Sequence, residues 1–171
     1  TIAIEIQDNK ASIIKLACET DFVARGDEFK ALAQNIAKQI LAGKTADQFK
    51  DEINAFITKV GENIQIIDTQ VIEADPNLTT YSIGSYIHST GKLAALVICD
   101  GGDQVLSKDL CMQIVAVNPM FISPEEVSAD LVAKEKEIWK ENLKNEGKPE
   151  NIWDKIMIGK EKKFKEENAL L

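Results

Sequence analysis

Histidine, cysteine and long apolar runs are scarce in this sequence of 171 residues. The single histidine, His88, excludes a histidine-rich zinc site, and no spacing of cysteine and histidine favours any other zinc site. The three cysteines, Cys18, Cys99 and Cys111, form no C-x-x-C motif and lie among apolar neighbours. This pattern favours reduced, buried thiols in a cytoplasmic protein. No run of about 18 apolar residues is present, so no transmembrane helix is expected.

Side chains typical of catalysis are also missing. A nucleophilic triad needs a base beside serine or cysteine, yet His88 is the only histidine and no G-x-S-x-G elbow occurs. The run from His88 to Lys92 ends like a phosphate-binding loop. However, Tyr86 stands where the first glycine belongs, and Leu93 replaces the required serine or threonine. We therefore expect no enzyme activity, no metal and no cofactor.

Positive charge is in short supply as well. The chain has 20 lysines and arginines against 28 acidic residues, which gives a formal net charge of -8. Nonspecific nucleic-acid binding needs cationic side chains to neutralise phosphates, so this balance argues against it. Residues 2–6 alternate like a strand and no basic segment precedes them, so we expect no signal peptide. A protein is the expected partner, rather than a nucleic acid or a membrane.

The first part of the chain, residues 1–77, combines strand and helix patterns. Two β-branched segments joined by a polar turn predict a hairpin, and Thr20 is a suitable N-cap for the helical turn that follows. Apolar residues at 3-4 spacing then predict two helices before a third strand. The predicted elements cover, in order, residues 2–6, 11–19, 27–42, 46–59 and 64–73.

The same pattern recurs in residues 78–127. Two strands are predicted around a turn at residues 88–91, and an amphipathic helix follows that ends before Pro119. Lys10–Glu19 matches Lys92–Asp100 in its order of apolar and polar residues. We infer a duplicated unit, an antiparallel hairpin packed on helices. The predicted fold class is α+β, with two related subdomains that each have an antiparallel sheet packed on helices.

Residues 128–171 predict a projecting antiparallel helical hairpin. Ser128 is placed to cap a first helix, and Pro149 falls in the first turn of the second. The apolar stripes are short and interrupted, so a long regular coiled coil is not predicted, and a homodimer through the hairpin stays open. Trp139 and Trp153 are expected to pack between the two helices.

Four segments of the chain resemble one known protein family, in the same order and spacing. They are residues 16–25, which contain Thr20-Asp21-Phe22-Val23-Ala24, and residues 59–64, 84–88 and 118–127. Together these segments resemble translation elongation factor Ts over essentially the whole chain. Full-length members of that family begin with a small helical module and many continue past the hairpin. We therefore expect this chain to lack the N-terminal module and the C-terminal end.

The resemblance implies a function in guanine-nucleotide exchange. The family binds elongation factor Tu carrying GDP and accelerates release of the nucleotide. Residues matching Asp21 and Phe22 push into the partner near its Mg²⁺ site. Those matching Val60 and Gly61 lie near a partner helix, and the match of His88 is on the same contact face. The predicted partner-binding residues are therefore Thr20, Asp21, Phe22, Val23, Val60, Gly61 and His88.

A structural interpretation of these residues leads to an alternative function. Phe22 at a helix start is typical of an apolar staple that packs in the core. Asp21 is typical of an acidic residue that stabilises a helix N-terminus. His88 is typical of a solvated residue in a turn. The alternative is a protein-interaction scaffold of the same fold without exchange activity, in which the hairpin does the binding. An exposed Phe22 would favour exchange, and a buried Phe22 would favour the scaffold.

Overall fold

The computed structural model describes the whole chain, Thr1–Leu171. Its two antiparallel sheets and six α-helices confirm the α+β class. Contacts divide the chain into two compact units, Thr1–Val115 and Ala116–Leu171. The three-part division with boundaries after residues 77 and 127 stays a prediction. The strands and α-helices are β1 (Ile2–Gln7), β2 (Lys10–Ala17), α1 (Asp21–Arg25), α2 (Asp27–Leu41), α3 (Lys50–Val60), β3 (Gln65–Glu73), β4 (Tyr81–Ile87), β5 (Ala94–Asp100), α4 (Gln104–Val117), α5 (Ala129–Asn145) and α6 (Trp153–Asn168).

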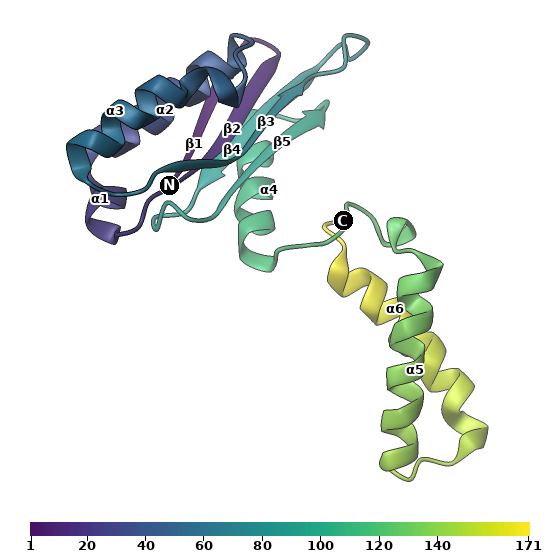
Figure 1. Cartoon of the computed structure of the whole chain (residues 1–171). Helices are drawn as coiled ribbons and strands as arrows, with labels where there is room; N and C mark the ends of the chain where they lie inside the picture. Colours follow the sequence, from purple (N-terminus) through teal and green to yellow (C-terminus); the bar gives the residue numbers. More distant parts are fainter. The chain divides into compact units, whose positions relative to one another are not determined.

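The first sheet has the order β1-β2-β3, and β2 pairs antiparallel with both neighbours. Because side chains alternate along a strand, the even-numbered residues of β2 share one face. On that face Ile14 and Leu16 are buried, and the hydroxyl of Ser12 donates a hydrogen bond to the Ala37 carbonyl of α2 at 2.8 Å. The helix α2 lies along β1 and β2 (Figure 1).

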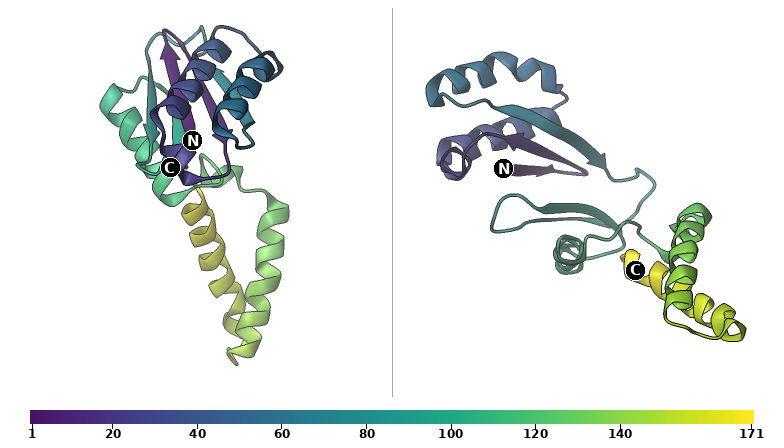
Figure 2. Two further views of the ribbon diagram at one scale, coloured as in Figure 1. Left: turned by 60° about the vertical axis from the view of Figure 1, so that its left-hand side comes forward. Right: turned by 60° about the horizontal axis from the view of Figure 1, so that its bottom comes forward.

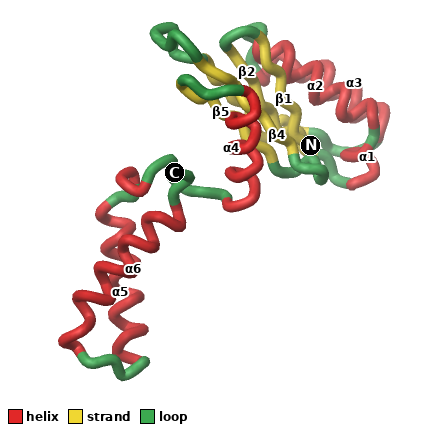
Figure 3. Tube along the Cα trace, turned by 180° about the vertical axis from the view of Figure 1, so that it is seen from behind, coloured by secondary structure: helices red, strands yellow, loops and turns green.

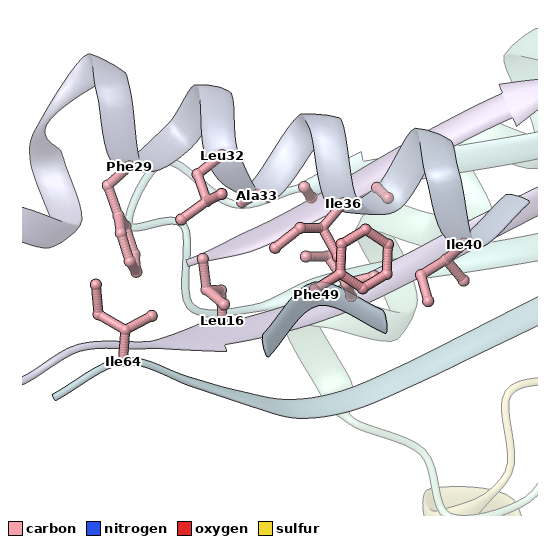
Figure 4. Close-up of a cluster of buried hydrophobic side chains, with 11 residues drawn as sticks. Leu16, Phe29, Leu32, Ala33, Ile36, Ile40, Phe49 and Ile64 are labelled. Carbon is pink, nitrogen blue, oxygen red and sulfur yellow. The ribbon is translucent and has the colours of Figure 1, made fainter. Parts of the chain in front are cut away.

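A cluster of buried apolar residues forms the core between α2 and this sheet. The stripe predicted on α2 is buried along its whole length, from Phe29 to Ile40. Figure 4 shows its side chains directed toward Leu16, Phe49 and Ile64. Phe49 belongs to a short 3-10 segment, Ala46–Phe49, that precedes α3. The core therefore holds α2 and the start of α3 in fixed positions, and these helices border the loops described below.

The second sheet consists of β4 and β5, paired antiparallel from Tyr81 opposite Asp100 to Ile87 opposite Ala94. It is followed by α4, which lies beside these strands (Figure 3). A Cβ atom on Gly84 would lie 2.4 Å from the carbonyl carbon and oxygen of Ser107. The backbones of β4 and α4 therefore meet without a side chain between them. The sequence predicted this hairpin and helix, and thus a second unit of strand, strand and helix.

The unit Ala116–Leu171 is mostly helical. Its helices α5 and α6 lie side by side as a hairpin in both views of Figure 2. The hydroxyl of Ser128 accepts a hydrogen bond from the Leu131 amide, as predicted for an N-cap. The Trp139 and Phe164 rings pack edge to face at 5.7 Å between centroids. The Trp153 indole instead donates a hydrogen bond to the Lys148 carbonyl at 2.9 Å, in the loop between the helices.

All three cysteines are free thiols. Only Cys111 is buried, so the prediction of buried thiols is wrong for Cys18 and Cys99, which are half-buried. Burial raises the pKa of the Cys111 thiol to about 11. No helix has both the length and the apolar character needed to cross a membrane.

Candidate functional site

The short helix α1 presents an aromatic ring to solvent. Thr20 is its N-cap, and the Thr20 hydroxyl accepts a hydrogen bond from the Val23 amide at 3.4 Å. Val23 packs against the core, while the Phe22 side chain beside it is 86% exposed. A phenylalanine in water forgoes about 1.5–3 kcal/mol of burial free energy, so this position is not explained by stability of the fold. The core staple considered for Phe22 is therefore wrong.

Charged groups border this ring. Asp21 forms an ion pair with Arg25, one turn along α1, at 3.2 Å between Oδ2 and Nη2. Both side chains are exposed, so water and salt screen the pair and it stabilises α1 only weakly. The two groups are free to exchange this contact for one with another molecule.

The loop before α1 is fixed by a residue far away in the sequence. Glu62 Oε2 accepts hydrogen bonds from the backbone amides of Glu19 at 3.1 Å and Thr20 at 3.0 Å. Glu62 Oε1 accepts a third from the Thr20 hydroxyl at 2.5 Å. These bonds, led by the one from the Thr20 hydroxyl, lower the pKa of the Glu62 carboxyl, which is therefore ionised at neutral pH.

The segment of Glu62 is the turn between α3 and β3. Val60 ends α3 with its side chain packed against the core, and Gly61 follows as the C-cap with φ of 74°. This left-handed conformation is accessible to glycine at no steric cost. The predicted contact residues Val60 and Gly61 are thus neighbours of the loop that precedes Phe22, connected to it through Glu62.

His88 lies at the end of β4, in the turn that leads to β5. Its backbone amide donates to the Leu93 carbonyl, and its carbonyl accepts from the Gly91 amide, both at 2.8 Å. The Tyr86 hydroxyl lies 3.3 Å from His88 Nδ1, and the two rings meet edge to face. The imidazole is half-buried. The tyrosine therefore fixes the orientation of the ring while part of it stays accessible.

A surface pocket of about 630 Å³ connects His88 with α1. Asp21 and Arg25 line it from α1, and Ile87, His88 and Lys92 line it from the β4–β5 hairpin. The structure thus brings Asp21 and His88 to one pocket, although 67 positions separate them in the sequence (88 minus 21). Phe22 is not among the residues that line this pocket.

Sequence reasoning missed two residues of this region, Glu62 and Arg25. Glu62 belongs to the segment 59–64 that carried the resemblance, but its hydrogen bonds join residues 42 and 43 positions apart. Arg25 lies at the i+4 position from Asp21, a spacing at which ion pairs form on helices. No cluster of three or more histidine, cysteine or acidic side chains with the geometry of a metal site is present.

Comparisons with known proteins agree on one family. A family model described as elongation factor TS matches residues 19–171. The chain is 39% identical to elongation factor Ts of Lactiplantibacillus plantarum over 180 aligned residues, which cover 98% of this chain and 61% of the relative. It is 38% identical to elongation factor Ts of Francisella tularensis subsp. novicida, with 99% and 61% covered. It is 40% identical to that of Hydrogenobaculum sp., with 95% and 63% covered. The chain thus spans about 61% of the length of the first two of these relatives.

Proposed function

Because the chain belongs to the elongation factor Ts family, we propose that it is a guanine-nucleotide exchange factor that promotes release of GDP from elongation factor Tu. Its contribution to translation elongation is then binding work and not catalysis of a chemical reaction. The cytoplasm is the compartment that fits such a role. The observation that carries the proposal is the Phe22 ring, 86% exposed on a helix whose start is capped and anchored.

The proposed mechanism is differential binding. An exchange factor must bind more tightly to the partner conformation that holds GDP poorly. Phe22 acts as an apolar wedge that is buried only when a loop of the partner moves aside from the Mg²⁺ site. Losing the contact between Mg²⁺ and the phosphates weakens GDP binding further. By reciprocity, bound GDP weakens binding of the exchange factor by the same factor.

Magnitudes indicate how the work is divided. Burying one phenylalanine side chain contributes about 1.5–3 kcal/mol, which is roughly one to two decades in an equilibrium constant. The remaining effect falls to the surrounding contacts. Asp21 and His88, which line one pocket, are proposed to contact the same partner domain. The turn at Val60 and Gly61 is proposed to contact a partner helix.

The test is stopped-flow release of a fluorescent GDP analogue from elongation factor Tu. We expect the wild-type chain to accelerate release. We expect Phe22→Ala to reduce the second-order rate constant of release roughly 10- to 100-fold, from the burial energy that is lost. Because the Phe22 side chain is exposed, the thermal unfolding midpoint of the Phe22→Ala variant should equal that of the wild type. Ile158→Ala is the matched control, because Ile158 is also exposed and lies on α6, outside the proposed contact residues.

The outcomes separate the two functions considered. If the wild type and Phe22→Ala accelerate GDP release equally, the Phe22 wedge is not part of the mechanism. A wild-type chain that binds elongation factor Tu without accelerating release would instead identify the scaffold.

A further inference from the structure

A single carboxylate holds the loop that leads into α1. Glu62 accepts hydrogen bonds from the amides of Glu19 and Thr20 and from the Thr20 hydroxyl. The Thr20 hydroxyl in turn accepts from the Val23 amide, which is part of α1. An unbroken chain of hydrogen bonds therefore runs from Glu62 to the helix that carries Phe22.

Glu62 itself stands on a rigid support. It follows Gly61, whose amide donates to the Ile57 carbonyl at 2.8 Å and whose left-handed φ turns the chain away from α3. On its other side Ile64 is buried in the core. The backbone of Glu62 is thus held between a helix end and a core residue, so its ordering adds no further entropy loss when the side chain binds the loop.

The loop that it holds has few other anchors. Glu19, Thr20, Asp21 and Phe22 are all exposed, and no residue of α1 is buried. A helix of five residues is too short to be stable by its own hydrogen bonds. The position of Phe22 therefore depends on its flanking contacts, which are the packing of Val23 against the core and the three hydrogen bonds that Glu62 accepts.

We propose that Glu62 is a positioning residue for exchange, which fixes the start of α1 so that the Phe22 ring is presented to the GTPase in one orientation. This inference rests on the proposed function and adds to it a residue that makes no contact with the partner through its own side chain. Without the carboxylate, the ring would be distributed over several orientations, and only the fraction with the competent one would bind.

The test combines Glu62→Gln with Phe22→Ala. Glu62→Gln removes the charge with little change in volume, and its single acceptor oxygen replaces only one of the two carboxylate oxygens, so the anchor is weakened. We expect Glu62→Gln to raise the half-saturating concentration for GDP release on the order of tenfold, the size of one lost hydrogen bond to a charged group. In the Phe22→Ala background the same change should have almost no further effect, because there is no ring left to position.

Glu28→Gln is the matched control. It removes the same charge from an exposed glutamate, whose carboxylate pairs with Lys59 and accepts no hydrogen bond from the loop. Amide hydrogen exchange measured on the free protein gives an independent readout. We expect Glu62→Gln to speed exchange at Glu19 and Thr20, whose amides are left with a weaker, neutral acceptor, and we expect no such change in Glu28→Gln.

Three results would overturn the inference. The first is that Glu62→Gln accelerates GDP release as well as Glu28→Gln does, while Phe22→Ala is impaired. The proposed exchange function would then stand without the positioning role. The second is an equal loss from Glu62→Gln in both backgrounds, which would indicate a purely structural role. The third is a wild-type chain without exchange activity, in which case the proposed function fails and the positioning role fails with it.

Discussion

At the scale of single residues, Gly84 explains how the second sheet meets its helix. Any Cβ at this position would overlap the backbone of Ser107, which is fully buried. We predict that Gly84→Ala destabilises the protein by about 1–3 kcal/mol, the usual cost of overpacking, as measured by urea unfolding. Gly159→Ala is the control, because its Cβ would meet no atom within 4 Å. In the middle of α6 it should stabilise by roughly 1 kcal/mol. Equal effects of both variants would contradict the packing argument.

Residue types predicted where the site lies in the sequence, but not how its members are held. Phe22 at a helix start has two interpretations, and only the fold decides between a buried staple and an exposed ring. Thr20 could be predicted as an N-cap because its partner, the Val23 amide, is three residues away. Glu62 could not be predicted, because its partners lie 42 and 43 positions back and are brought close by the order of the core elements.

At the scale of elements, the buried face of α2 could be predicted from its apolar stripe, whereas α4 was predicted as a helix without its buried face. Two large apolar residues of α4, Leu106 and Val117, are 52% and 51% exposed. The buried residues of α4 are instead Ser107 and Cys111. Small side chains are needed on this face because the helix approaches Gly84 too closely for a leucine. Periodicity of large apolar residues misses a contact of this kind.

An ion pair joins α5 and α6 of the hairpin, and its contribution to stability should depend on pH. Glu161 pairs with Lys136 of α5 at 2.6 Å and with Lys165 of α6 at 2.8 Å. Hydrogen bonds from Lys136 and then Lys165 lower the pKa of Glu161 from 4.5 to about 2. Because the folded-state pKa is depressed, the contribution to stability is present above pH 4.5 and is lost as pH falls toward about 2.

We predict that the thermal midpoint of the hairpin falls over this pH window in the wild type more steeply than in Glu161→Gln. Both tryptophans of the chain, Trp139 and Trp153, lie in the hairpin, so tryptophan fluorescence reports its unfolding. Glu141→Gln, a change at a hairpin glutamate without an ion pair, should follow the wild-type curve. Parallel curves for wild type and Glu161→Gln would contradict a role for the pair.

At the scale of the whole molecule, the proposed contact residues and the hairpin belong to different compact units. Residues 20–23, 60–61 and 88 all lie in Thr1–Val115, as does the buried cluster between α2 and the first sheet. The hairpin lies in Ala116–Leu171 and contributes no residue to the candidate site. The exchange function and the scaffold function therefore place the working surface in different parts of the chain.

We predict that a chain ending at Val115 retains GDP release within roughly a factor of ten of the full chain, a difference of about 1.4 kcal/mol in binding free energy. Every proposed contact, and the Glu62 anchor of α1, remains in such a chain. Stopped-flow release of labelled GDP measures the activity, and circular dichroism confirms that strands and helices persist. Phe22→Ala in the same shortened chain is the control and should reduce the acceleration roughly 10- to 100-fold, as in the full chain. If the shortened chain is folded but no longer accelerates GDP release, the working surface lies in the unit Ala116–Leu171, because only that unit has been removed.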